Sequence, residues 1–193
     1  FKPGAILELV KYFNDPSVGM VSGARVLYDE ERGLSYSEGA YWKYESFIKK
    51  CESRFNSCTS SPGEINAILR TAFTPPPEGI INDDSFMTLS IVHNGYSIKY
   101  EPKAQSYEYV SATAKEEVKR RKRINAGRYQ IISQADQLLP WKRNPWFVWE
   151  YLSHKIFRPY AAFALVMILL FNVLAFIFPM AGKTAWVFLP APL

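Results

Sequence analysis

The sequence has few of the residues that build disulfide frameworks and metal sites. Its 193 residues include two cysteines, Cys51 and Cys58, and two histidines, His93 and His154. Two cysteines are too few for a disulfide framework, and their spacing to the histidines matches no metal-binding pattern. The composition therefore excludes a disulfide-stapled secreted scaffold and fits a reducing, cytosolic environment.

The chain also lacks an initiator methionine, a signal peptide, internal repeats and low-complexity segments. It opens on Phe1-Lys2-Pro3-Gly4, and we expect it to be a piece of a larger protein. Hydrophobic residues make up 48% of it, aromatic residues 16%, and the formal net charge is +5. This length and composition allow one domain with a substantial core.

One long stretch, residues 159–180, carries no charge at all. Its length fits the roughly 20 residues that a membrane-spanning helix needs. Basic residues gather before this stretch, which by the positive-inside rule places its N-terminal side in the cytoplasm. These residues are Lys142, Arg143, Lys155 and Arg158, and the aromatic residues suited to an interfacial belt are Trp146, Trp149, Tyr151 and Tyr160.

The predicted organisation is therefore a cytoplasmic domain docked on the cell membrane. We expect a domain over residues 1–140, an interfacial amphipathic segment over 141–158 and a transmembrane helix over 159–180. Residues 181–193 would form a loop and the start of a further span, giving a multi-pass protein.

Helical and strand patterns alternate through the first 140 residues and predict a mixed α/β fold. Helices are expected over residues 5–13, 37–54, 83–94 and from 115 onward, and strands over 18–28, 64–70, 96–100 and 104–110. Gly19 and Gly23 predict close backbone approaches in the first strand. A packed face on the second helix is predicted from the helical spacing of Tyr41, Tyr44, Ile48 and Cys51.

Two adjacent carboxylates, Asp83 and Asp84, open the helix that follows the Pro-rich loop at residues 74–79. The N–H groups and the dipole of a helix N-terminus stabilise a carboxylate in the first turn. One interpretation is a helix cap, in which Asn82 or Asp83 accepts N–H bonds. The other is a functional carboxylate whose charge the helix terminus holds in place.

A basic run at residues 119–130 lies on a helix that begins with the capping-box pattern of residues 113–116. Arg120 and Arg123 share one helix face, with Gly127 a turn later. Arginine suits bidentate phosphate binding. The run is open to three interpretations: a solvated charged face, contact with anionic lipid, or a grip on a nucleotide diphosphate. We expect no nucleic-acid partner, because no recognised binding module accompanies the run.

Several passages occur in the order found in one enzyme family. They are residues 1–28, Gly63–Arg70, Asn82-Asp83-Asp84 in place of Thr-Glu-Asp, residues 95–104, Arg120–Ile124 in place of Q-x-x-R-W, and Ser153-His154-Lys155. Together they resemble the membrane-bound processive glycosyltransferases of family 2, the class of cellulose, chitin, hyaluronan and poly-N-acetylglucosamine synthases. The resemblance implies an α/β fold: the second half of a GT-A, Rossmann-like domain, followed by an interfacial helix and a transmembrane helix.

The resemblance also implies roles for individual residues. Asp84 would be the general base that takes a proton from the acceptor hydroxyl, and Asp83 would orient it. The departing diphosphate would be neutralised by Arg120, Arg121 and Arg123. Gly63 and the loop before it would shape the acceptor site, while Arg70 is as readily structural as functional.

Two residues depart from the family pattern. Arg120 replaces its Gln, and Ile124 replaces the Trp that offers an aromatic platform at the acceptor site. Ile124 keeps the acceptor-binding position without the stacking surface, and Tyr129 or Trp141 could supply a substitute. The acceptor could then be bound differently, or be something other than a long glucan.

The family's Asp-x-Asp metal motif and uridine-binding strands would lie upstream of residue 1. The resemblance thus implies Mg²⁺ or Mn²⁺ as cofactor with no ligand in this stretch, which we expect to be inactive alone. It implies a nucleotide-sugar donor, UDP-linked, and a growing polysaccharide as acceptor. The alternatives are a single-addition lipid-linked sugar transferase, and a non-catalytic membrane-anchored module that binds anionic lipid through the basic helix.

Overall fold

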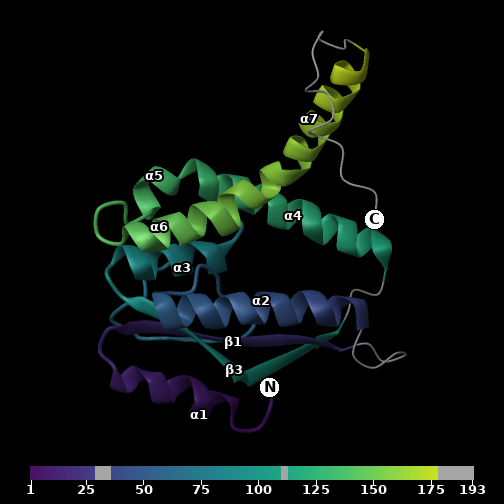
Figure 1. Cartoon of the computed structure of the whole chain (residues 1–193). Coiled ribbons are helices and arrows are strands. Elements are labelled where there is room, and N and C mark those ends of the chain that lie inside the picture. Colours follow the sequence, from purple (N-terminus) through teal and green to yellow (C-terminus); the bar gives the residue numbers. More distant parts are fainter. Residues whose placement is uncertain (29–35, 110–112, 178–193) are drawn as a thin grey trace. The chain divides into compact units, whose positions relative to one another are not determined.

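The computed structural model describes residues 1–28, 36–109 and 113–177. The chain divides into two compact units, Phe1–Tyr151 and Leu152–Leu193. The first unit has the mixed α/β architecture that the sequence predicts (Figure 1). The loop and further span expected over residues 181–193 lie outside the described residues.

Three strands form the sheet of the first unit, in the order β2-β1-β3. Strand β1 is Val18–Tyr28, β2 is Asn66–Ile68 and β3 is Ser97–Tyr109. Strand β1 pairs antiparallel with β2 and parallel with β3. The first predicted strand is confirmed with its bounds, whereas the strand predicted over residues 64–70 is shorter than expected.

The two strands predicted over residues 96–100 and 104–110 are instead one strand, β3. Pairing shifts register between Ser22↔Tyr100 and Ala24↔Gln105, so β3 advances five residues while β1 advances two. The extra residues form a bulge, which accommodates Pro102 without ending the strand. The separate strands were predicted because proline usually interrupts a ladder.

The close backbone approaches predicted at Gly19 and Gly23 are confirmed. A Cβ added to Gly19 would lie 2.6 Å from the Cβ of Tyr96, and one added to Gly23 would lie 2.5 Å from the carbonyl oxygen of Ala104. Only glycine leaves room for β3 to bulge towards β1 at this point.

Helices cover both faces of the sheet (Figure 1). Helix α1, Ala5–Val10, continues into the 3₁₀ turn η1, Lys11–Asn14, and covers one face. Helices α2, Tyr36–Phe55, and α3, Asp83–His93, lie on the other. Under α1 the core cluster consists of Ala5, Leu9, Val18, Val21, Ile65 and Ala104.

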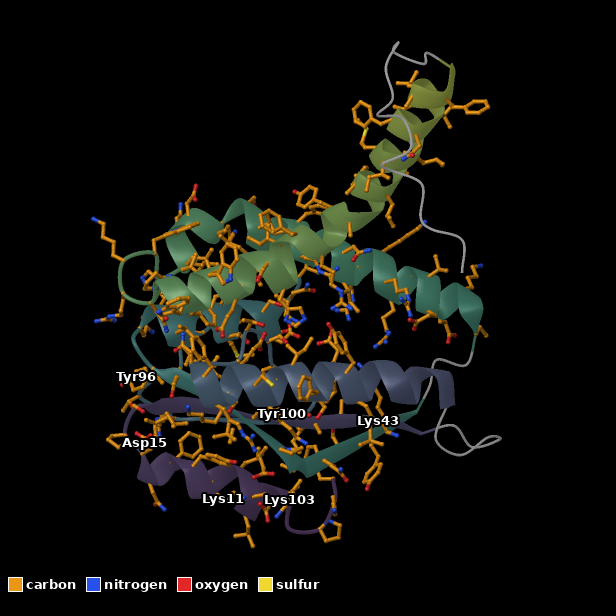
Figure 2. The ribbon with its side chains drawn as sticks, in the orientation of Figure 1. Lys11, Asp15, Lys43, Tyr96, Tyr100 and Lys103 are labelled. Atoms are coloured by element: carbon orange, nitrogen blue, oxygen red, sulfur yellow. The ribbon has the colours of Figure 1, made fainter. Side chains whose placement is uncertain are left out.

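The buried carboxylate of Glu101 fastens α1 and η1 to β3. Its oxygens accept from Lys11 Nζ at 2.7 Å, from the Tyr12 hydroxyl at 3.0 Å and from the Lys103 N–H at 2.9 Å. Figure 2 shows Lys11 and Lys103 on the α1 side of the sheet. These bonds hold the pKa of Glu101 below its usual range despite burial, so it stays charged and paired at neutral pH.

Helix α2 turns three of its charged side chains inward. Glu45, Lys49 and Glu52 are buried at 5%, 9% and 6% exposure. Lys49 Nζ lies 5.6 Å from the ring centre of Tyr100, whose hydroxyl is 3.0 Å from Ser46 Oγ. Figure 2 shows Tyr100 where β3 passes α2. The interior side of this helix is therefore polar.

The outer side of α2 is correspondingly aromatic. Tyr44, Phe47 and Phe55 are 61%, 63% and 66% exposed. The packed face predicted for this helix is therefore wrong at Tyr44 and at Cys51, which is also exposed. The spacing was helical, but periodicity does not say which face of an amphipathic helix points inward.

Three further helices complete the first unit: α4, Ala114–Ser133; α5, Ala135–Leu138; and α6, Pro145–Tyr151. The predicted capping box at the start of α4 is confirmed at Thr113, whose side chain accepts from the Glu116 N–H at 3.2 Å. Helices α4 and α5 both contact α3. The long basic helix therefore packs beside the helix that carries the two carboxylates.

The second unit begins with the π-helical turn η2, Leu152–Ile156, followed by α7, Phe157–Ile177. Within α7 the Asn172 side chain donates to the Ile168 carbonyl oxygen at 2.8 Å, one helical turn earlier. Across residues 1–28, 36–109 and 113–177, no helix has the length and apolar character required to cross a membrane. The membrane span predicted over residues 159–180 is therefore not shown.

Candidate active site

The two predicted carboxylates open α3, as expected. Asp83 Oδ1 accepts the Asp84 N–H at 2.9 Å, and Asp84 Oδ1 accepts the Ser85 N–H at 2.7 Å. Thr88 Oγ1 donates to the Asp84 carbonyl oxygen at 2.8 Å and steadies the first turn. Asp83 is exposed, whereas Asp84 is partly buried. Of the pair, Asp84 has the more enclosed carboxylate.

Asn82 occupies the N-cap position of α3, but its side chain makes no capping hydrogen bond. Its amide Nδ2 instead donates to the Ile124 carbonyl oxygen of α4 at 3.0 Å. A Cβ added to Gly127 would lie 2.4 Å from Asn82 Cγ, so α4 reaches this close only at a glycine. The capping interpretation is thus wrong for Asn82, whose side chain joins the two helices that carry the predicted site.

Gly63, predicted at the acceptor site, lies beside Asp84. A Cβ added to Gly63 would have the Asp84 Cβ as its neighbour at 3.7 Å, an ordinary van der Waals distance. The fold therefore brings together the glycine and the carboxylate that the sequence assigned to one site.

The loop before Gly63 is anchored by buried polar groups. Glu52, inside α2, accepts from the Thr59 N–H at 3.0 Å and from Thr59 Oγ1 at 2.9 Å. The Cys58 N–H donates to the Ile98 carbonyl oxygen at 3.0 Å. Asn66 Nδ2 donates to the Pro62 carbonyl oxygen at 3.2 Å. The inward-facing Glu52 of α2 therefore helps to fix the loop that carries Gly63.

Burial raises the pKa of Asp84 above its usual range. The charges of Asp83 and Glu64 raise this pKa further, while the hydrogen bonds from Ser85 oppose the shift. The helix terminus does favour the charged carboxylate, as expected, but burial outweighs it. A carboxylate with a raised pKa is a better proton acceptor, which suits a general base.

Glu64 is itself held by an ion-pair chain. Arg25 Nη1 lies 3.0 Å from Glu64 Oε1, and Arg25 Nε lies 2.9 Å from Glu108 Oε2. The Arg25 side chain is only 10% exposed, so water screens this chain weakly. Glu64 was not predicted as a site residue, although it follows Gly63 directly in the sequence.

The predicted arginines divide between two sides of α4. Arg120 and Arg123 lie seven and four residues before Gly127, on the face that packs against Asn82. Arg121 follows Arg120 by about 100° around the helix and is exposed. Both Arg120 and Arg121 pair with Glu117, at 3.2 Å and 2.7 Å. By helical spacing Arg120 and Arg123 share the side of α4 that carries Gly127, where Arg120 is half-buried and Arg123 is exposed.

Tyr151, at the end of α6, belongs to this region, although its aromatic character predicted an interfacial position. It is 6% exposed, so that prediction is wrong, whereas Trp146 and Trp149 of the same helix are exposed. Burial raises the pKa of Tyr151 to about 12; the charge of Arg128 lowers it and that of Asp84 raises it. Nothing in the sequence separated this buried tyrosine from its exposed aromatic neighbours.

Ile124 is half-buried on α4, and its backbone carbonyl serves the contact with Asn82. Tyr129 and Trp141, the possible substitute platforms, are each 46% exposed. Arg70 lies exposed just after β2. None of the described contacts joins these three side chains to Asp84.

No group of three or more His, Cys, Asp or Glu in the described part of the chain could hold a metal ion. The acid pair, with Glu64 nearby, is not arranged as a ligand set.

The family model described as glycosyl transferase family group 2 matches residues 1–193, the whole chain. A search of curated proteins found no match. The chain belongs to glycosyl transferase family group 2 and is a glycosyltransferase, which implies a nucleotide-sugar donor and an acceptor.

Proposed function

We propose that this glycosyltransferase moves a sugar from a UDP-linked donor to a growing polysaccharide, with inversion at the anomeric carbon. The observation that carries the proposal is the partly buried Asp84 at the start of α3, beside Gly63 and next to the arginine-bearing helix α4. One carboxylate placed between an acceptor loop and a cationic helix is what a single displacement requires.

In the proposed reaction Asp84 accepts the proton of the acceptor hydroxyl. The oxygen of that hydroxyl attacks the anomeric carbon as the bond from this carbon to the donor's diphosphate breaks. The diphosphate leaves with the bonding electron pair. Asp83 helps to orient Asp84 through the hydrogen bond from the Asp84 N–H to Asp83 Oδ1.

The leaving diphosphate is assigned to Arg120 and Arg123, with Arg121 in a supporting role. Cations fixed beside a developing negative charge stabilise the transition state more than the ground state. The pairing of Arg120 and Arg121 with Glu117 supports this assignment, because it restrains both side chains before a nucleotide binds. A divalent cation, Mg²⁺ or Mn²⁺, bound by residues upstream of residue 1, is part of the proposal.

The residues near Asp84 indicate the identity of the acceptor less clearly than that of the donor. Gly63 leaves space beside Asp84, and Ile124 offers an apolar surface without an aromatic ring. A long glucan usually needs stacking platforms, so Ile124 favours a second candidate, single addition of a sugar to a lipid-linked acceptor. Product length separates the two.

We further propose that the enzyme works at the cytoplasmic face of the cell membrane. The support is the outer side of α2, where exposed Tyr44, Phe47 and Phe55 alternate with the exposed cations Lys43, Lys50 and Arg54. Both acids in residues 43–55, Glu45 and Glu52, are buried. Aromatic and cationic side chains together are typical of surfaces that rest on anionic lipid.

Helix α6 extends this surface. The rings of Phe55 and Trp146 meet edge to face with centroids 5.9 Å apart, and Trp149 is exposed one turn later. We call these five aromatic residues, Tyr44, Phe47, Phe55, Trp146 and Trp149, the aromatic face. Association of a second copy here would bring two rows of like charges together, which disfavours a homodimer.

The decisive test of the reaction is Asp84→Asn in the full-length enzyme, with Asp136→Asn as control. Asp136 is an exposed carboxylate in the first turn of α5, so it matches Asp84 in position on its helix. Asparagine cannot accept the proton, and we expect sugar transfer to fall by about 100- to 10,000-fold at Asp84 only. Transfer near the wild-type rate in Asp84→Asn would remove Asp84 as the base.

A further inference from the structure

Gln130 of α4 holds the loop before α3 with both ends of its side-chain amide. Nε2 donates to the Gly79 carbonyl oxygen at 2.8 Å, and Oε1 accepts the Ile81 N–H at 2.9 Å. Each amide atom fills a role that the other cannot. A glutamate at this position would place an oxygen against the Gly79 carbonyl, and an alanine would reach neither backbone group.

A second contact lies three to six residues earlier on the same helix, at Gly127 and Ile124. The Asn82 side chain donates to the Ile124 carbonyl oxygen at 3.0 Å and fills the space where a Gly127 side chain would stand. Gly127 is buried, with Asn82 Cγ and Oδ1 both 2.4 Å from the position of an added Cβ. The α4 backbone therefore rests directly on the residue that precedes the acid pair.

The two contacts prevent α4 from sliding along its own axis and from rotating about it, relative to the start of α3. Gln130 and Gly127 are three residues apart and lie on neighbouring faces, so the helix can neither slide nor turn without breaking one contact. Arg123 and Arg120 follow on the same side, four and seven residues before Gly127. The backbone positions of these two arginines are thus fixed relative to α3 through Asn82 and Gln130, within two helical turns of Gly127.

We propose that Gln130 and Asn82 are positioning residues, which hold Arg120 and Arg123 at the donor's diphosphate while Asp84 meets the acceptor hydroxyl. This inference rests on the proposed function, since it assigns the cations and the base to one displacement. Neither side chain touches the reacting atoms; both act through α4. We call Asn82, Gly127 and Gln130 the latch.

The proposed reaction explains why Asp84 and the two arginines need to be held in a fixed arrangement. Proton removal and diphosphate departure are concerted, so the base and the cations must be placed together. A displacement of about 1 Å can cost on the order of 100-fold in rate. The latch joins α3 to α4 through one loop, the side chains of Asn82 and Gln130, and the close approach at Gly127.

The first test uses Gln130→Ala and Gln130→Glu in the full-length enzyme, with Gln137→Glu on α5 as control. Gln137 is an exposed glutamine close by on the next helix. We expect both Gln130 variants to lower kcat by about tenfold or more and to raise the KM for the donor, with the acceptor KM unchanged. Wild-type kcat and donor KM in Gln130→Ala would overturn the latch.

The second test exploits the close packing of Gly127. Gly127→Ala should displace α4 and lower kcat, and Asn82→Ala should lower it through loss of one hydrogen bond. Once Asn82→Ala has removed the amide, the added methyl has room, so the double variant should be no slower than Asn82→Ala alone. A double variant that shows the product of both single losses would contradict the proposed contact.

A measurement made without substrate tests the latch independently of the proposed reaction. Hydrogen exchange of the amides at residues 79–82 should quicken in Gln130→Ala and stay unchanged in Gln137→Glu, because the Ile81 N–H donates to Gln130. Unchanged exchange at Ile81 would overturn the latch even if the enzyme is active. If wild type and Asp84→Asn transfer sugar equally, the proposed reaction fails while the exchange result still decides the latch.

Discussion

Gly63 and Asp84 are neighbours: a Cβ placed on Gly63 would stand 3.7 Å from the Cβ of Asp84. The glycine ends a loop fixed by Glu52 and Thr59, and the aspartate begins α3. Because Gly63 is not among the glycines with positive φ, its backbone can carry a side chain without strain. What glycine provides here is space beside the carboxylate.

The size of the residue at position 63 should control access of the acceptor. We expect Gly63→Ala to fold normally and to keep kcat within about threefold of wild type, because the contact it creates is an ordinary one. Gly63→Phe should raise the acceptor KM by about tenfold or more with the donor KM unchanged. Steady-state kinetics with each substrate varied separately checks this, and a rise in donor KM instead would place Gly63 elsewhere.

Removing the charge of Glu64 should shift the pH dependence of transfer. Burial, then the charges of Asp83 and Glu64, raise the pKa of Asp84, so activity should fall as pH drops through that raised pKa. Glu64→Gln removes one of the charges that raise the pKa of Asp84 and should therefore move the acidic limb of kcat/KM to lower pH. Glu78→Gln, an exposed acid in the Pro-rich loop, is the control and should leave the limb in place.

Glu150 should make the fold less stable at alkaline pH. Burial, with a smaller contribution from the charge of Glu52, raises the pKa of Glu150 from 4.5 to about 7. The folded protein therefore binds this proton more tightly than the unfolded chain does, so the contribution of Glu150 to stability is fully present below pH 4.5 and is lost as pH rises through about 7. Glu150→Gln should raise the Tm at pH above 7, and leave it unchanged well below 4.5.

Thermal unfolding of the full-length protein at both pH values tests this expectation. The wild-type protein, measured at the same two pH values, is the reference for this comparison. A Tm gain for Glu150→Gln that is equal at both pH values would mean that the carboxyl group is not titrating as described.

The aromatic face should bind anionic vesicles. Burying one phenylalanine in lipid contributes about 1.5–3 kcal/mol, so Phe47→Ser and Phe55→Ser should each weaken binding by about tenfold or more. Leu7→Ser serves as control, because Leu7 is 73% exposed on α1, on the opposite face of the sheet. Co-sedimentation with vesicles that contain phosphatidylserine measures this, and equal losses for Leu7→Ser and Phe47→Ser would contradict a specific face.

Much of the fold could be predicted from local signals. Pro16 and Gly95 end helices, Thr113 begins one, and the two glycines of β1 indicated the close approaches that the structure has. These signals depend on the conformation of one or two residues, which the sequence specifies directly. The shape of β3 could not be predicted in this way, because its continuity past Pro102 depends on a bulge shared with β1.

The candidate site was predictable as a set of residues but not as an arrangement. Adjacent acids at a helix start and a run of arginines are visible in the sequence, and the fold places their helices in contact. The amide of Gln130 and the burial of Tyr151 depend on which helices pack together, which no local pattern encodes. For the same reason, the sequence did not predict that the aromatic side of α2 faces outward.

The parallel pairing of β1 with β3 has a consequence for the order in which the protein folds. Gly63 and Asp84 both lie in the long crossover between these strands. Strands β1 and β3 must pair before the residues of the crossover can pack in their final positions. Closing so long a loop is slow. We expect sheet closure and assembly of the proposed catalytic centre to be one kinetic event, so that a partly folded chain with β3 detached lacks the arrangement of Gly63 and Asp84 altogether.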